Sequence, residues 1–163
     1  PLSLALSLAP IANQPKIILH LIAAGGNVNT CADTGESLLH LAARGGQGVI
    51  TLEALRLGAD VTVPDRQGMT VAHALAQLPQ PEMLRTVLQR APQLAHTADA
   101  NGITPMRLVL RHLAQTPARG AETHVATLMQ MAHILIENGA DPSTQGDNGA
   151  TLLHEAVARN LPD

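Results

Sequence analysis

The sequence predicts an all-α solenoid, in which short helix-turn-helix units joined by hairpin-like loops stack side by side. A helix start of similar sequence recurs along the chain, and in all but the last unit it opens a pair of short apolar stretches of helical spacing. The second stretch stops at Gly25, Gly58, Ala91 and Gly139, which are 33, 33 and 48 residues apart. The chain has no Phe, Trp or Tyr, so a core of Leu, Ala, Val, Ile and Met favours small, closely packed helices.

The best-formed unit covers residues 32–64. Ser37 opens a short apolar helix that Gly45 and Gly46 stop, because glycine enters the left-handed cap conformation without a Cβ clash. A second helix ends at Gly58, and we expect its buried side to hold the apolar residues Val49, Ile50, Leu52, Leu55 and Leu57. Two helices this short cannot close a core by themselves, so the unit needs copies stacked on either side.

We expect a single domain of five units, at residues 1–31, 32–64, 65–98, 99–145 and 146–163. Unit one should have helices over 2–9 and 15–24. In unit three a Leu-Pro pair replaces the glycine stop, and Pro81 starts the next helix at its first position. Unit four carries an insertion near 114–127, after which Glu122 begins an unusually long helix that ends near Asn138. Unit five is partial.

Three segments carry a family resemblance: Asp99-Ala100-Asn101-Gly102-Ile103-Thr104-Pro105, Leu39-His40-Leu41-Ala42-Ala43 and Gly139-Ala140-Asp141. They resemble the ankyrin repeat, whose pattern is D-x-x-G-x-T-P-L-H-x-A-A, then a second helix, then G-A-D. The resemblance covers nearly the whole chain and implies an ankyrin-repeat solenoid of four to five repeats. Pro1 stands where the motif has its proline, and Asp163 precedes the last unit's second helix, so we expect a piece of a larger protein.

The fourth position of the motif is His40, His73 and His154 in three of the units. The resemblance implies that this histidine bonds the motif's hydroxyl and a backbone carbonyl of a neighbouring turn, which ties units together. Unit four has Arg107 instead. Arginine cannot reproduce the donor-and-acceptor pattern of a neutral imidazole, so we expect a looser or partly exposed junction there.

Composition excludes several classes of function. The formal charge is −3, basic residues are scattered, and stacking aromatics are absent, so we expect no nucleic-acid partner. The single cysteine, Cys31, excludes an internal disulfide and suits a reducing compartment, which predicts an intracellular, cytoplasmic location. The apolar stretch at 1–12 is too short to span a bilayer, so we expect no membrane association.

No catalytic, cofactor or metal site is expected. His124 and His133 are nine residues apart, which places them on opposite faces of one helix, so they cannot join His112 in binding one ion. Cys31, Asp33 and His40 contain the ingredients of a cysteine nucleophile, but we assign the cysteine to a loop and the histidine to the repeat motif. The glycine-rich runs stop helices and lack the lysine of a phosphate-binding loop.

The remaining hypothesis is recognition of a partner protein by a monomeric fragment. In ankyrin domains the hairpin tips and first helices line a concave face, and the resemblance implies contact residues at these positions. They are Glu36, Arg44, Arg66, Gln67, Met69, Gln77, Asn101, Ile103, Arg111, His112, Asp147 and Asn148. Met69 and Ile103 are apolar tip residues one unit apart, which suits adjacent anchors flanked by Arg66 and Arg111.

Two alternatives stay open. The chain could be the substrate-recruiting domain of a larger enzyme, for example a bacterial effector in the host cytosol that modifies a host protein, as a caspase ADP-riboxanase does. A catalytic motif elsewhere in the parent sequence would favour that role. The chain could also be an inert spacer, and a charge reversal at Arg66 and Arg111 that loses no cellular partner would favour that role.

Overall fold

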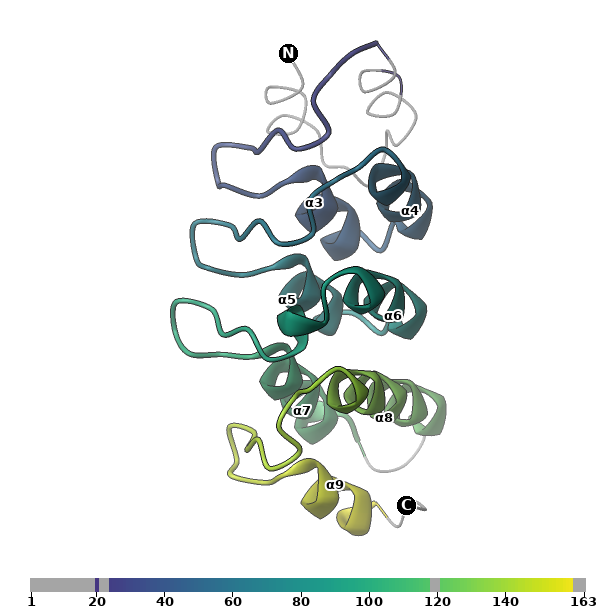
Figure 1. Cartoon of the computed structure of the whole chain (residues 1–163). Coiled ribbons are helices and arrows are strands. Elements are labelled where there is room, and N and C mark those ends of the chain that lie inside the picture. The colour runs from purple at the N-terminus through teal and green to yellow at the C-terminus, as the bar shows by residue number, and fades with distance from the viewer. Residues whose placement is uncertain (1–19, 21–23, 118–120, 160–163) are drawn as a thin grey trace.

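The computed structural model describes residues 20, 24–117 and 121–159, and these form a single row of helix pairs (Figure 1). The two helices expected at 2–9 and 15–24 lie almost entirely outside the described residues. Among the described residues the regular structure is helical, apart from one isolated bridge between Cys31 and Ser37. The predicted all-α solenoid is therefore confirmed.

Each described unit contributes a first helix and, except the last, a second helix. The first helices are α3 (Leu38–Arg44), α5 (Val71–Ala76), α7 (Pro105–Gln115) and α9 (Leu152–Ala158). The second helices are α4 (Gly48–Arg56), α6 (Pro81–Arg90) and α8 (Glu122–Glu137), and a 3₁₀ turn, η2 (Pro92–Ala95), follows α6. First helices pack on first helices and second helices on second helices, which gives two layers (Figure 1).

The helix starts follow from a recurring hydroxyl. Ser37, Thr70 and Thr151 are N-caps whose side chains accept from the backbone N–H of the third helical residue, and the Nδ1 of the histidine there accepts from the cap's own backbone N–H. Thr104 caps α7 by accepting from the N–H of Arg107 at 3.4 Å. These bonds satisfy N–H groups that a helix start leaves without an intrahelical partner, so the repeated Ser or Thr sets where each first helix begins.

The helices end where the sequence predicts, but the left-handed residue after α3 is only one of the two expected glycines. The left-handed residue after α3 is Gly46, with φ of +69°, whereas Gly45 has a right-handed φ of −81°. Pro81 stands in the first turn of α6, and α8 begins at Glu122, as expected. Unit four is enlarged on both sides of its loop, because α7 runs to Gln115 and α8 has 16 residues.

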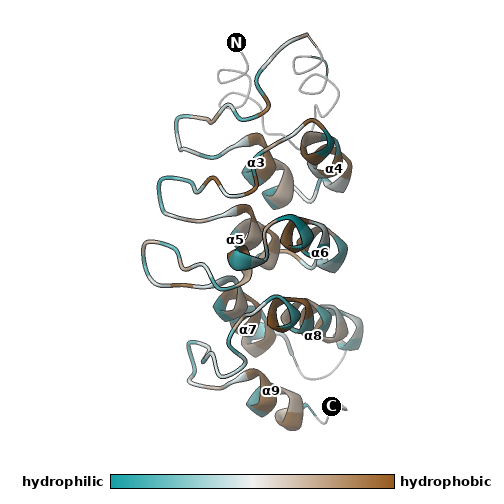
Figure 2. Cartoon of the chain, viewed as in Figure 1, coloured by the Kyte–Doolittle hydropathy of each residue, from teal (hydrophilic) through white to brown (hydrophobic). Residues whose placement is uncertain are grey.

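The core is continuous from unit to unit rather than closed within each. Buried side chains such as Leu39, Leu75, Leu84, Met106 and Leu135 belong to one cluster that runs the length of the row. Figure 2 shows hydrophobic residues concentrated on the helices and hydrophilic ones on the projecting loops. Each fully buried leucine contributes about 1.5–3 kcal/mol, so the stacking of neighbours supplies the stability that a lone pair of helices lacks.

The expected buried side of α4 was wrong in part. Ile50 and Leu55 are buried together with Thr51 and Ala54, but Val49 is 77% exposed, and Leu52 and Leu57 are exposed as well. At 100° per residue, positions 50, 51, 54 and 55 share one side of the helix. Val49 and Leu52 fall on the opposite side with Glu53 and Arg56. The apolar residues of α4 lie on both sides, so the sequence pattern did not show which of them would be buried.

The loops before the first helices form one repeated turn, here called tips two to five: residues 32–36, 65–69, 99–103 and 146–150. In each tip the first N–H donates to the carbonyl of the fifth residue at 2.8 Å, and the fourth residue is a glycine with positive φ. The tips project from one edge of the row beside the first helices (Figure 1). We call the surface formed by tips and first helices the tip face.

Candidate functional site

A buried histidine connects each of two neighbouring pairs of units. His40 Nδ1 lies 2.9 Å from the Ser37 hydroxyl, and its Nε2 lies 2.9 Å from the carbonyl oxygen of Met69 in tip three. His73 repeats this with Thr70 at 2.9 Å and with the carbonyl of Ile103 at 3.0 Å. A carbonyl can only accept, so Nε2 carries the proton and Nδ1 is the acceptor. The structural role expected for these histidines is confirmed.

These histidines are poorly suited to acid–base chemistry. Burial lowers the pKa of His40 and of His73, although the bonds to the Met69 and Ile103 carbonyls partly oppose the shift. Both ring nitrogens are already hydrogen-bonded in each case.

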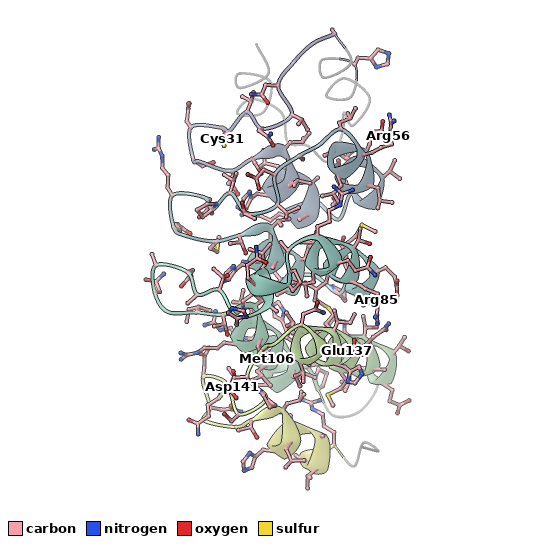
Figure 3. All side chains as sticks on the ribbon, viewed as in Figure 1. Cys31, Arg56, Arg85, Met106, Glu137 and Asp141 are labelled. Atoms are coloured by element: carbon pink, nitrogen blue, oxygen red, sulfur yellow. The ribbon has the colours of Figure 1, made fainter. Side chains whose placement is uncertain are left out.

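Cys31, on the loop before α3 (Figure 3), has its sulfur 3.7 Å from the carbonyl of Asn29. The described contacts therefore form no Cys31–His40 pair.

The junction between units four and five uses charge instead of an imidazole. Arg107 Nε lies 3.1 Å from one carboxylate oxygen of Asp147, and Arg111 Nε lies 2.5 Å from the other. The hydrogen bond from Arg111, reinforced by Arg107, holds the pKa of Asp147 below its ordinary value. The junction is partly exposed, as expected, since the Arg107 side chain keeps 39% of its surface in solvent.

A hollow of about 320 Å³ opens on the tip face between tips two and three. It is lined by Thr34, Glu36, Arg44, Asp65, Arg66, Gln67 and Met69. Five of these are contact residues expected from the sequence, and they come from two different tips and the end of α3. The structure thus brings together side chains that the sequence separates by more than thirty positions.

Within the hollow, the carboxylate of Glu36 organises its neighbours. It accepts from the Thr34 hydroxyl at 2.9 Å and forms an ion pair with Arg44. Glu36 is buried while Arg44 is exposed, so the acid positions the arginine rather than presenting itself to solvent. Met69 is half-buried, with its sulfur 4.0 Å from the amide nitrogen of Gln77.

The other expected contact residues are more dispersed. Asn101 is exposed at tip four, whereas Ile103 packs partly against the core and is less free than an anchor would be. His112 is half-buried and donates to the Ala76 carbonyl, and burial lowers the pKa of its ring. Asn148 donates to the buried carboxylate of Glu155 at 3.2 Å, which holds tip five to α9.

The region around the described histidines of unit four shows no metal site. On α8, His133 Nε2 lies 3.4 Å from the carboxylate of Glu137. The same carboxylate lies 3.7 Å from the guanidinium of Arg85 on α6 (Figure 3). Residues 24–117 and 121–159 contain no group of three or more potential metal ligands. In the same residues we find no helix with the length and apolar character needed to cross a membrane.

Sequence reasoning did not name Asp65 and Arg107 as contact residues of this surface. Asp65 lines the hollow, while its carboxylate accepts from the N–H groups of Gln67 and Met69 inside tip three. Arg107 joins Arg111 around Asp147. The i, i+4 spacing of the two arginines was visible in the sequence, but the approach of Asp147 from 36 residues away was not.

Comparison with known proteins agrees with this architecture. The ankyrin repeat family matches residues 34–66. The chain is 29% identical to a putative palmitoyltransferase ZDHHC13 of Danio rerio over 94% of its length, and 28% identical to neurogenic locus notch homolog protein 1 of the same species over 90%. It is 30% identical to the NF-kappa-B inhibitor delta of Mus musculus over 78%. The matches span 27%, 6% and 42% of those proteins, so less than half of each.

The stacked helix pairs, the glycine turns and the histidine ties define a helical repeat protein of the solenoid class. The chain is an ankyrin-repeat domain. Domains of this family are generally protein–protein interaction modules and typically non-catalytic.

Proposed function

We propose that this domain recognises a partner protein through its tip face, which corresponds to the concave face of the family, with the hollow between tips two and three as the main contact. The observation that carries the proposal is the convergence of Arg44, Arg66, Gln67 and Met69 around one hollow. Arginine and methionine are enriched in protein interfaces, and hot spots gather in central pockets of this kind.

The hollow is also held in shape before any partner arrives. The backbone N–H of Arg66 donates to the Thr34 carbonyl at 3.4 Å, which joins the two tips. The buried ring of His40 donates to the Met69 carbonyl and so holds the end of tip three. Glu36 holds Arg44. A preformed surface loses little conformational entropy on docking, so a few contacts can give useful affinity.

The test places a photo-crosslinking residue at Gln67 in the hollow or, as a control, at Gln89, an exposed glutamine on α6. In cell lysate we expect a discrete protein adduct from position 67 and not from position 89. Adding Arg66→Glu and Met69→Asp should abolish the adduct while the melting temperature stays unchanged. Identical adducts from both positions would contradict the proposal.

A second candidate is the substrate-recruiting arm of a larger enzyme. It is favoured by the relative named a putative palmitoyltransferase, of which the match spans 27%. In a parent enzyme, Arg66→Glu with Met69→Asp should slow turnover of a protein substrate and leave turnover of a small acceptor unchanged. Equal loss with both substrates would argue against recruitment. The roles of bacterial effector and caspase ADP-riboxanase, and the intracellular location, stay predictions.

A further inference from the structure

The junction between units four and five lacks the contacts that close the earlier junctions. Ala100 N–H donates to the Gln67 carbonyl at 2.9 Å, and a Cβ on Gly68 would lie 2.9 Å from that same nitrogen. At tip four, a Cβ on Gly102 would meet nothing within 4 Å, and the described residues of tips four and five share no backbone hydrogen bond. Tip five therefore stands apart from tip four.

What bridges this opening is the pair of arginines that holds Asp147. Each arginine bonds the carboxylate through Nε, and neither has a hydrogen bond from its terminal nitrogens to the described residues. A guanidinium has four N–H donors on those terminal nitrogens. The side chains of Arg107 and Arg111 are 39% and 37% exposed, so these donors are within reach of a partner.

Counted by direct ion pairs, the two arginines carry one positive charge more than their shared carboxylate. Two guanidiniums face the single carboxylate of Asp147. The next acid, Asp99, acts on Arg111 only at longer range, with no direct ion pair to either arginine, and its Oδ1 accepts from the N–H groups of Asn101 and Ile103. A carboxylate would neutralise this cluster, whereas a phosphate dianion would leave it negative. The planar Nη edge of an arginine also matches a carboxylate in geometry.

We propose that Arg107 and Arg111 dock a carboxylate side chain from an acidic segment of a partner protein, while Asp147 holds both guanidiniums in place through their Nε atoms. The inference rests on the proposed function, because it assumes that the partner lies along the tip face. It adds a second contact near tip five and names its chemistry.

The test follows the side-chain Nε–H NMR signals of the arginines while a short peptide rich in Asp and Glu is added to the whole domain. We expect the Arg107 and Arg111 signals to shift. The signal of Arg56, which pairs with Glu53 on the second-helix side (Figure 3), should not move. A matched Asn and Gln peptide should give no shift. Equal shifts of all three arginine signals, or no shift with the acidic peptide, would overturn the inference.

Variants separate geometry from charge. Arg107→Lys with Arg111→Lys keeps the charge and should weaken peptide binding at least several-fold, whereas Arg56→Lys should leave binding unchanged. Equal binding by the double-lysine variant would refute the forked contact, and tighter binding of inorganic phosphate than of the peptide would refute the carboxylate. Because these measurements do not involve the hollow, they can fail while crosslinking at Gln67 succeeds, and the reverse is equally distinguishable.

Discussion

The Nε2 atom of His73 lies 3.0 Å from the carbonyl oxygen of Ile103, so the imidazole of one unit holds the tip of the next. The ring is buried and its Nδ1 is bonded to Thr70 within its own unit. This single side chain therefore links three structural features: the start of α5, the shape of tip four and the spacing between two units.

Replacing His73 with alanine should lower the free energy of unfolding by about 1–3 kcal/mol, because it leaves buried polar partners without a hydrogen bond. The matched control is His154→Ala, which removes the same motif residue from α9. His154 bonds Thr151 at 2.8 Å but is exposed. Urea unfolding should show a clear fall in midpoint for the first variant and a small one for the second. Equal midpoints would refute the role of His73.

Stability should also depend on pH through the buried histidines. Burial lowers the native pKa of His40, His73 and His112 from the ordinary value of 6.5. As pH falls below about 6.5, the unfolded chain binds protons that the buried native histidines do not bind. The stability that these histidines contribute is therefore fully present above that pH and is lost as the pH falls below it. The urea midpoint should fall between pH 7.5 and pH 5, and less steeply in a variant with His40 and His73 replaced by glutamine. Parallel slopes would contradict this.

Unit stacking predicts different outcomes for substitutions of two leucines that occupy equivalent motif positions. Leu39 on α3 is 1% exposed because the next unit covers it, whereas Leu153 on α9 is 66% exposed. Leu39→Ala should cost about 2–5 kcal/mol, the usual range for a buried leucine. Leu153→Ala should change stability by no more than about 0.5 kcal/mol. Chemical unfolding of both variants checks the pair, and similar costs would mean that unit stacking does not govern burial.

Two glycines test the spacing of the tips. Gly68 and Gly102 have nearly the same positive φ, +76° and +74°, so alanine meets a similar backbone strain of about 1–2 kcal/mol at either position. Only Gly68 also lies against a neighbouring backbone, because an added methyl would sit 2.9 Å from the Ala100 nitrogen, while Gly102 faces open space. Gly68→Ala should therefore lower the melting temperature more than Gly102→Ala. The reverse order would show that tip four is as closely stacked as tip three.

Much of this architecture could be predicted because its causes are local. The capping hydroxyls of Ser37 and Thr70, the left-handed turn at Gly58 and the proline start of α6 all act within a few residues. Of the contact residues, those flanking the tip glycines could be named because the repeat motif places them. Their role in binding is still a proposal.

Other features depended on residues distant in sequence. Whether Val49 or Ile50 faced the core depended on where the neighbouring helices packed, and periodicity was compatible with both in so apolar a helix. The hollow arises because tips two and three stack, which also turns Glu36 inward onto Arg44. The bond of Asp147 to both arginines likewise joins separate units.

By itself the sequence determined the repeat, its helix starts and stops, and the histidines that join units, since these follow from backbone conformation and hydrogen bonds between near neighbours. Only the tertiary structure decided which surfaces are closed and which are open: tip three is bonded to tip four, tip five is joined to α7 through two arginines without a bond between the tips in the described residues, and a hollow opens beside Arg66. The physical reason is that each junction depends on contacts between residues of two neighbouring units, which are distant in sequence. Its geometry therefore cannot be derived from either unit alone.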